Sequence, residues 1–172
     1  IKNTFNGNVA VGQAGVSVEL ANSDNISSIG TVTLGGLGNE NNFNTNVSKF
    51  ISLNNETSST TGDPVWTGTY ISTKGKVTAN VNGVNNNYNA GAGLQLPSAM
   101  LIANLFNLED KIQHKIDDFG IGFVLIKANN DFVTVNSFVT PETTTPSVQR
   151  GIDAASAGFT VNVDAGSFTE QL

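Results

Sequence analysis

The chain has 172 residues, which is enough for one domain or two small ones with a substantial core. Only 13% of the residues are charged and the net charge is −6, so nucleic acid is not an expected partner. No apolar run approaches the length of a membrane span, so membrane insertion is not expected either. The absence of cysteine excludes disulfides, a thiol nucleophile and a thiolate zinc site. The sequence is rich in glycine and contains 24 asparagines, a composition typical of turns and stacked side-chain ladders that favours an extracellular location.

Residues 1–58 contain a repeat. The string NTFNGNV at 3–9 returns as NNFNTNV at 41–47, an offset of 38 residues. Apolar residues alternate between and after the two copies, at Val16, Val18, Leu20, Ile29, Val32, Leu34, Phe50, Ile51 and Leu53. This pattern predicts solenoid coils that stack Phe5 on Phe43, and Asn6 on Asn44 or Asn8 on Asn46 as amide ladders. The alternative is a turn sequence that occurs twice in an asparagine-rich chain.

Residues 59–95 are predicted to form a β insert followed by a loop. Alternation over 65–84 around Lys74-Gly75-Lys76 predicts an antiparallel hairpin. Three aromatic residues are candidates for carbohydrate binding, because an aromatic face suits the apolar side of a sugar ring. They are Trp66, Tyr70 and Tyr88. For Trp66 the competing interpretation is an ordinary core residue.

Residues 96–140 are predicted to form a capping helix and a small β piece. The apolar residues of 96–118 recur with helical spacing, at Leu101, Leu105, Leu108, Ile112 and Ile116. A helix with one apolar face would seal the end of a stack of coils, whose exposed strand edges otherwise invite aggregation. Residues 119–138 then alternate as short strands around a turn at Asn129-Asn130-Asp131.

Residues 141–172 are predicted to form a linker, a second cap helix and the first strand of a new solenoid block. Val148, Ile152 and Ala155 make an apolar helical stripe that ends before Gly158. Phe159, Val161 and Val163 then alternate with polar residues, which predicts a strand.

This last stretch resembles the start of right-handed parallel β-helices of the pectin-lyase-like superfamily, in which a helix caps the first coil. The matching residues are Gln149, Ile152, Asp153, Ala154, Ala155, Gly158, Thr160, Val161, Val163, Gly166 and Glu170. Phe159 departs from the pattern, and the motif stands at the end of this chain rather than at the start of a domain. The resemblance implies a fold but no activity, because that fold serves lyases, hydrolases, adhesins and phage spikes.

Residues 109–138 also resemble connectors between β-helix blocks in very large secreted repeat proteins of Bacteroidetes-type bacteria, including gliding-type surface adhesins. The residues that carry this second resemblance are Lys111, Ile112, His114, Lys115, Ile116, Asp117, Gly122 and Phe123.

Catalytic signatures are not found. His114 is the single histidine, and without a nucleophile motif nearby we expect a surface or cap-packing role for it. Asp117, Asp118 and Asp131 are candidate calcium ligands, with helix-end solvation as the alternative. The single arginine, Arg150, lies in the second cap helix, and no pair of acids is aligned on the coils for glycoside hydrolysis.

The sequence therefore predicts an all-β protein of right-handed parallel β-helix coils with an antiparallel insert and amphipathic capping helices. The predicted function is that of a non-catalytic structural or adhesive repeat module, cofactor-free, in a large extracellular filamentous surface protein. Its predicted partners are neighbouring repeats or copies joined head-to-tail, and surface glycans. Two alternatives are a carbohydrate-binding or polysaccharide-degrading β-helix fragment and a segment of a phage or secreted spike. The chain is expected to be a piece of a longer protein.

Overall fold

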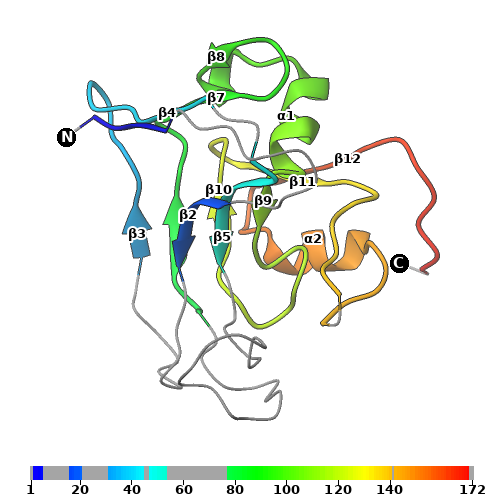
Figure 1. Ribbon diagram of the computed structural model, residues 1–172. Helices are drawn as coiled ribbons and strands as arrows, with labels where there is room; N and C mark the ends of the chain where they lie inside the picture. The colour runs from blue at the N-terminus through cyan, green and yellow to red at the C-terminus, as the bar shows by residue number, and fades with distance from the viewer. Residues whose placement is uncertain are drawn as a thin grey trace.

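The computed structural model describes residues 2–5, 16–20, 31–44, 47–53, 77–140 and 142–170. Within these residues the protein belongs to the all-β class, with short strands, one 3₁₀ helix at Pro97–Ala99 and two short α-helices (Figure 1). None of the helices in the described ranges is long and apolar enough to cross a membrane.

The strands follow one another through most of the chain. In order they are β1 (Thr4–Phe5), β2 (Val16–Leu20), β3 (Thr31–Thr33), β4 (Asn42–Phe43), β5 (Lys49–Leu53), β6 (Asn80–Asn82), β7 (Asn87–Asn89), β8 (Leu94–Gln95), β9 (Ile112–Gln113), β10 (Val124–Leu125), β11 (Asn130–Val133) and β12 (Thr160–Val163). Helix α1 (Ile102–Glu109) lies between β8 and β9, and α2 (Val148–Ala154) lies between β11 and β12.

Three sheets each take one strand from three successive passes of the chain. Their parallel strands are ordered β1-β4-β7, β2-β5-β9 and β3-β6-β10, and β8 pairs antiparallel with β7 at the edge of the first. Strands β11 and β12 form a further parallel pair. Figure 1 shows α1, β11 and α2 at the end of the molecule opposite to β1 and β3.

The register of these sheets aligns apolar side chains in three columns. The columns are Phe5-Phe43-Tyr88, Val18-Ile51-Ile112 and Val32-Val81-Val124. The ring centroids of Phe43 lie 4.8 Å from Phe5 and 4.9 Å from Tyr88, both in stacked geometry. The predicted stacking of Phe5 on Phe43 is thus confirmed, and each pass of the chain buries its inner face against the next.

Asparagine ladders accompany the apolar columns. The side chain of Asn89 donates to Asn44 Oδ1 at 3.0 Å, and that of Asn87 donates to Asn42 Oδ1 at 2.9 Å. Amide ladders were predicted from the repeat, but Asn6, Asn8 and Asn46 lie outside the described residues, so the predicted pairs themselves are not described.

The predicted antiparallel hairpin is wrong for its second strand. Strand β6 lies between β3 and β10 and is parallel to both, which leaves no edge for an antiparallel neighbour. Val77, Ala79 and Val81 are buried as their alternation indicated. Alternation reports one buried face but not strand direction. The first strand and turn of that hairpin lie outside the described residues.

The predicted helix over 96–118 is much shorter in the structure. Helix α1 ends at Glu109, and Ile112 belongs to β9, paired with Ile51 of β5. The backbone N–H of Phe50 donates to Lys111 O at 2.7 Å, so this segment satisfies donors of β5. Ile112 and Ile116 are buried as predicted, although by a strand and a turn, whereas Leu101 is 75% exposed.

The helix and the strand predicted within residues 141–172 are present as α2 and β12, and β12 pairs with β11. That α2 caps a coil and β12 begins a new solenoid block stays a prediction. The Ser147 side chain caps α2 by accepting from the N–H of Arg150 at 3.1 Å. The buried face differs from the prediction, because Ile152 is 45% exposed and Gly151 is buried instead. A Cβ on Gly151 would lie 2.3 Å from Val133 Cγ2, so only glycine permits this close approach of α2 to β11.

Candidate functional site

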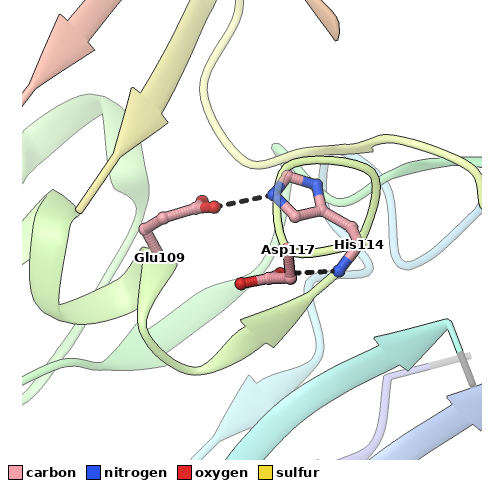
Figure 2. A group of neighbouring side chains, drawn as sticks. All are labelled: Glu109, His114 and Asp117. Atoms are coloured by element: carbon pink, nitrogen blue, oxygen red, sulfur yellow. Dashed lines mark hydrogen bonds and ion pairs between the residues drawn. The ribbon is translucent and has the colours of Figure 1, made fainter. Parts of the chain in front are cut away.

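Four titratable side chains from three elements lie buried at the junction of the sheets with the C-terminal part. Glu109 is the last residue of α1, His114 and Asp117 follow β9, and Asp131 lies on β11. All four are 3% exposed or less, and we call them the buried cluster. Figure 2 shows the Glu109 carboxylate pointing at the His114 ring, with Asp117 beneath it.

The hydrogen bonds of His114 fix its tautomer. Its Nδ1 accepts from the backbone N–H of Val124 at 2.9 Å, so the ring proton lies on Nε2. Nε2 therefore donates to Glu109 Oε1, at 2.6 Å. The ring also stacks on Phe123, with centroids 5.1 Å apart. These contacts define a neutral imidazole that connects α1 to β10.

Asp117 and Asp131 each accept a hydrogen bond from a backbone N–H with one carboxylate oxygen. Asp117 Oδ2 accepts from the His114 N–H at 2.9 Å, and Asp131 Oδ1 accepts from the Phe132 N–H at 2.6 Å. The other oxygen of Asp131 is buried and has no hydrogen-bond partner among the described residues. A buried oxygen of this kind is costly when the group is ionised.

Burial dominates the acid–base behaviour of the cluster. It raises the pKa of Asp117 to about 6 and that of Asp131 to about 7, and it raises the pKa of Glu109 well above its usual value. The pKa of His114 is lowered by burial, which outweighs the opposing charges of Asp117 and Asp131. The cluster therefore favours uncharged forms of its members.

A metal ion fits this arrangement poorly. Among the described residues, donor atoms of Glu109, His114 and Asp117 lie within 4.8 Å of one another, which is close enough for a shared ion. A metal-bound histidine normally donates its second ring N–H. Here the second nitrogen accepts from Val124, so the nitrogen facing Glu109 carries a hydrogen rather than a free lone pair.

The predicted calcium ligands do not converge as a set. Asp118 and Asp131 are not part of the group whose donor atoms come together, although all three aspartates are buried. Each of Asp117 and Asp131 already has one oxygen bound by a backbone N–H. The structure gives no support to calcium binding by Asp117, Asp118 and Asp131 together.

Of the two roles expected for His114, at the surface or in packing, the structure shows packing, because the residue is 1% exposed. The sequence analysis did not identify Glu109 as its partner. The available signal was a charged residue within an apolar helical run, directly after the buried Leu108. In this closed arrangement no member of the cluster offers a surface to a substrate.

The structure describes one of the three candidates for carbohydrate binding. Trp66 and Tyr70 lie outside the described residues. Tyr88 is fully buried, its ring stacks on Phe43, and its hydroxyl donates to Gly83 O at 3.0 Å. Tyr88 is therefore a core residue and does not line a sugar-binding surface.

The sequence did not predict an open pocket of about 430 Å³ beside α1, whose lining is polar and apolar in about equal parts. It is lined by Ser48, Asn89, Ala90, Gly91, Asn107, Asp110 and Lys111. Its charged groups are already used by the fold. Asp110 accepts from the side chains of Thr134 and Asn136, and Lys111 Nζ donates to Val47 O.

Comparison with known families, curated proteins and solved structures gives no match, so no family assignment follows.

Proposed function

We propose that the chain is a non-catalytic module of a right-handed parallel β-helix and serves as one structural repeat of a large filamentous surface protein. The observation that carries this proposal is the order of the strands. Three passes of the chain contribute strands in the same sequence to three parallel sheets. Stacked passes of this kind extend along one axis, which suits an elongated protein that projects from a surface.

The side-chain ladders also support a mechanical role, in which the module transmits force along the stack. Each pass is joined to the next by backbone bonds, by stacked rings and by asparagine amides. These contacts repeat along one direction, so a force along the stack is shared by three ladders. The described residues include no closed sheet, so the stack can be continued.

The partners we propose are neighbouring repeats or copies, joined head-to-tail. Strands β1, β2 and β3 are edge strands, each with one neighbour among the described residues. Unpaired backbone groups at such edges are templates for a further strand. Contacts that repeat without closing into a ring produce a fibre.

Electron microscopy of the native material, combined with its intact mass, tests this function. We expect fibres with a regular axial repeat, or a polypeptide much heavier than 18.0 kDa that contains this module. Compact, monodisperse particles of 18.0 kDa in the native material contradict the proposal.

The open pocket beside α1 favours carbohydrate binding as a second candidate function. Its charged groups are held by the fold, but the amide of Asn107 is of the kind that binds sugar hydroxyls. Glycan-array screening of the purified chain tests it, with Asn107→Ala as the variant, since the Asn107 side chain makes one long hydrogen bond within the described residues, of 3.4 Å to Ala90 O. Retention lost in that variant supports the candidate. Absence of retention by the parent chain contradicts it.

A further inference from the structure

The buried cluster holds more acids than cations. The one basic side chain of the cluster is the His114 imidazole, which contacts Glu109. None of Glu109, Asp117 and Asp131 forms an ion pair with a lysine or arginine of the described ranges. Three carboxylates that are 3% exposed or less cannot all be ionised beside a neutral histidine without a large loss of hydration energy. Protons are the simplest way to neutralise them.

The charged groups that face the cluster do not neutralise this excess of acidic side chains. Lys49 from β5 acts on the cluster through its field, but its Nζ donates to the backbone carbonyl of Asp110 at 2.8 Å. Lys115 lowers the pKa of Asp131 only slightly, and its Nζ donates to Asp153 O. Arg150 from α2 interacts electrostatically with Asp117 and Asp118, and its guanidinium donates to backbone carbonyls. Asp110 adds further negative charge beside Glu109.

We propose that the buried cluster binds protons and thereby stabilises the packing of α1, β10 and β11 at mildly acidic pH. At alkaline pH the cluster loses these protons and the packing becomes less stable. The geometry supplies the coupling. Glu109 is tied through His114 to the backbone of β10, and Asp131 brings its unpartnered oxygen from β11. Ionisation at this point places negative charge inside the contact between the stacked sheets and the C-terminal part. The proposal concerns the isolated chain and does not depend on the filament function.

The sign of the effect follows from proton linkage. Folding raises the pKa of Asp117 to about 6 and that of Asp131 to about 7, above the value of about 4 in an unfolded chain. The folded state therefore binds more protons, and the stability gained is complete below about pH 4 and is lost as pH rises through 6 and 7. His114, whose pKa is lowered, acts in the opposite direction below about pH 6.5. Three acids outweigh one base, so stability falls from pH 5.5 to pH 8.

Urea unfolding at pH 5.5 and pH 8, at constant ionic strength, tests this proposal. For each proton held, the unfolding constant should rise about tenfold per pH unit between the unfolded and folded pKa values. Asp131→Asn keeps the acceptor for the Phe132 N–H and removes one ionisable group, so its unfolding constant should change less with pH. Asp153→Asn, at an exposed position, is the matched control and should keep the full change. Equal stability of the parent chain at both pH values, or equal slopes for the two variants, overturns the proposal.

The single histidine allows a second test that needs no variant. Nitrogen NMR shifts of His114 report its tautomer and charge without overlap. We expect the neutral form with the proton on Nε2 throughout pH 5.5 to 8. An imidazolium at pH 7 overturns the proposal, because a charged histidine would supply the missing cation. A change of these shifts on addition of Zn²⁺ or Ca²⁺ also overturns it, because the cluster would then be a metal site.

Discussion

Asn41 and Asn86 are 45 residues apart in the sequence, and the side-chain amide of Asn41 donates to Asn86 Oδ1 at 3.0 Å. The Asn41 backbone N–H donates to the same oxygen at 3.1 Å. Asn3 repeats both contacts with Asn41 Oδ1, one pass earlier. The Asn3 and Asn41 amides both donate toward the later pass, whereas the Asn86 amide, at the end of the ladder, donates to the carbonyls of Leu34 and Gly83. The ladder fixes the register of three passes, because a shift by one residue would turn each asparagine to the opposite face.

Replacing Asn86 by alanine should destabilise the protein strongly. Asn86 is fully buried, and its side chain also donates to Leu34 O at 2.9 Å and Gly83 O at 3.0 Å. Its loss leaves the Asn41 donors and the Leu34 carbonyl without these partners, so the free energy of unfolding should fall by about 3 kcal/mol. Urea unfolding measures the change.

The control for Asn86 is Asn87→Ala, one position along the chain. Asn87 belongs to the partly exposed ladder, where its amide donates to Asn42 Oδ1. Water replaces that bond, so a cost below about 1 kcal/mol is expected. Equal losses in the two variants would show that burial of the inner ladder contributes nothing.

The repeat could be found in the sequence because two of its copies have nearly the same residues in the same order. Phe5 and Phe43 occur in similar strings, and their stacking followed from that similarity. The third copy was missed because Tyr88 replaces phenylalanine there and its offset from Phe43 is 45 residues instead of 38. An aromatic ring, not a particular residue, is what the column requires.

The periodicity of the apolar residues could predict neither where the helix within 96–118 ends nor the buried cluster. Leu105, Leu108 and Ile112 are all buried, but a helix buries the first two and a strand the third. Burial patterns alone do not distinguish these cases, since the deciding factor is a strand edge contributed by β5. Glu109 and Asp131 are 22 positions apart in the sequence yet interact electrostatically in the fold, and nothing local to either position indicates this interaction.

Gly122→Ala should prevent folding or lower the free energy of unfolding by at least about 3 kcal/mol. A Cβ at this position would lie 1.8 Å from the backbone oxygen of Ala79. The Gly122 N–H donates to Val77 O at 2.8 Å, so the two backbone segments cannot separate without losing this bond. Thermal unfolding and soluble yield measure the effect.

Gly36→Ala is the matched control, since a Cβ there meets no atom within 4 Å. Its effect should stay within about 0.5 kcal/mol. A stable Gly122→Ala protein with unchanged unfolding would contradict the close approach of the two segments.

Arg150→Lys should loosen the C-terminal part while leaving the sheets folded. The guanidinium donates to three backbone carbonyls from separate segments, those of Ile116, Ser137 and Thr145, at 2.6 to 2.8 Å. A lysine cannot reproduce this planar fork, so about 2 kcal/mol of local stability should be lost. Hydrogen exchange should accelerate in α2 and β12 but not in β5 or β6. Gln149→Ala, at the exposed neighbouring position, should leave these rates nearly unchanged.

Glu170→Gln should weaken α2 at neutral pH but not at low pH. Glu170 Oε2 accepts from the Ser147 hydroxyl at 2.7 Å, and Oε1 accepts from the N–H groups of Val148 and Gln149. Partial burial raises the pKa of Glu170, but these hydrogen bonds and the charge of Arg150 outweigh it, so its pKa lies below the usual value. A lowered pKa means that the stabilisation is present above about pH 4.3, the unfolded value, and is lost as pH falls through the folded value.

We therefore expect Glu170→Gln to cost about 1 kcal/mol at pH 7, as for the loss of a helix N-cap, and almost nothing near pH 3. Hydrogen exchange of the α2 amides at the two pH values measures the difference. Asp153→Asn removes an exposed carboxylate from the same helix and should leave α2 intact at both. Because Glu170 reaches back over 22 residues to the first turn of α2, a cost that persists at pH 3 would mean that the contact acts through packing and not through its charge.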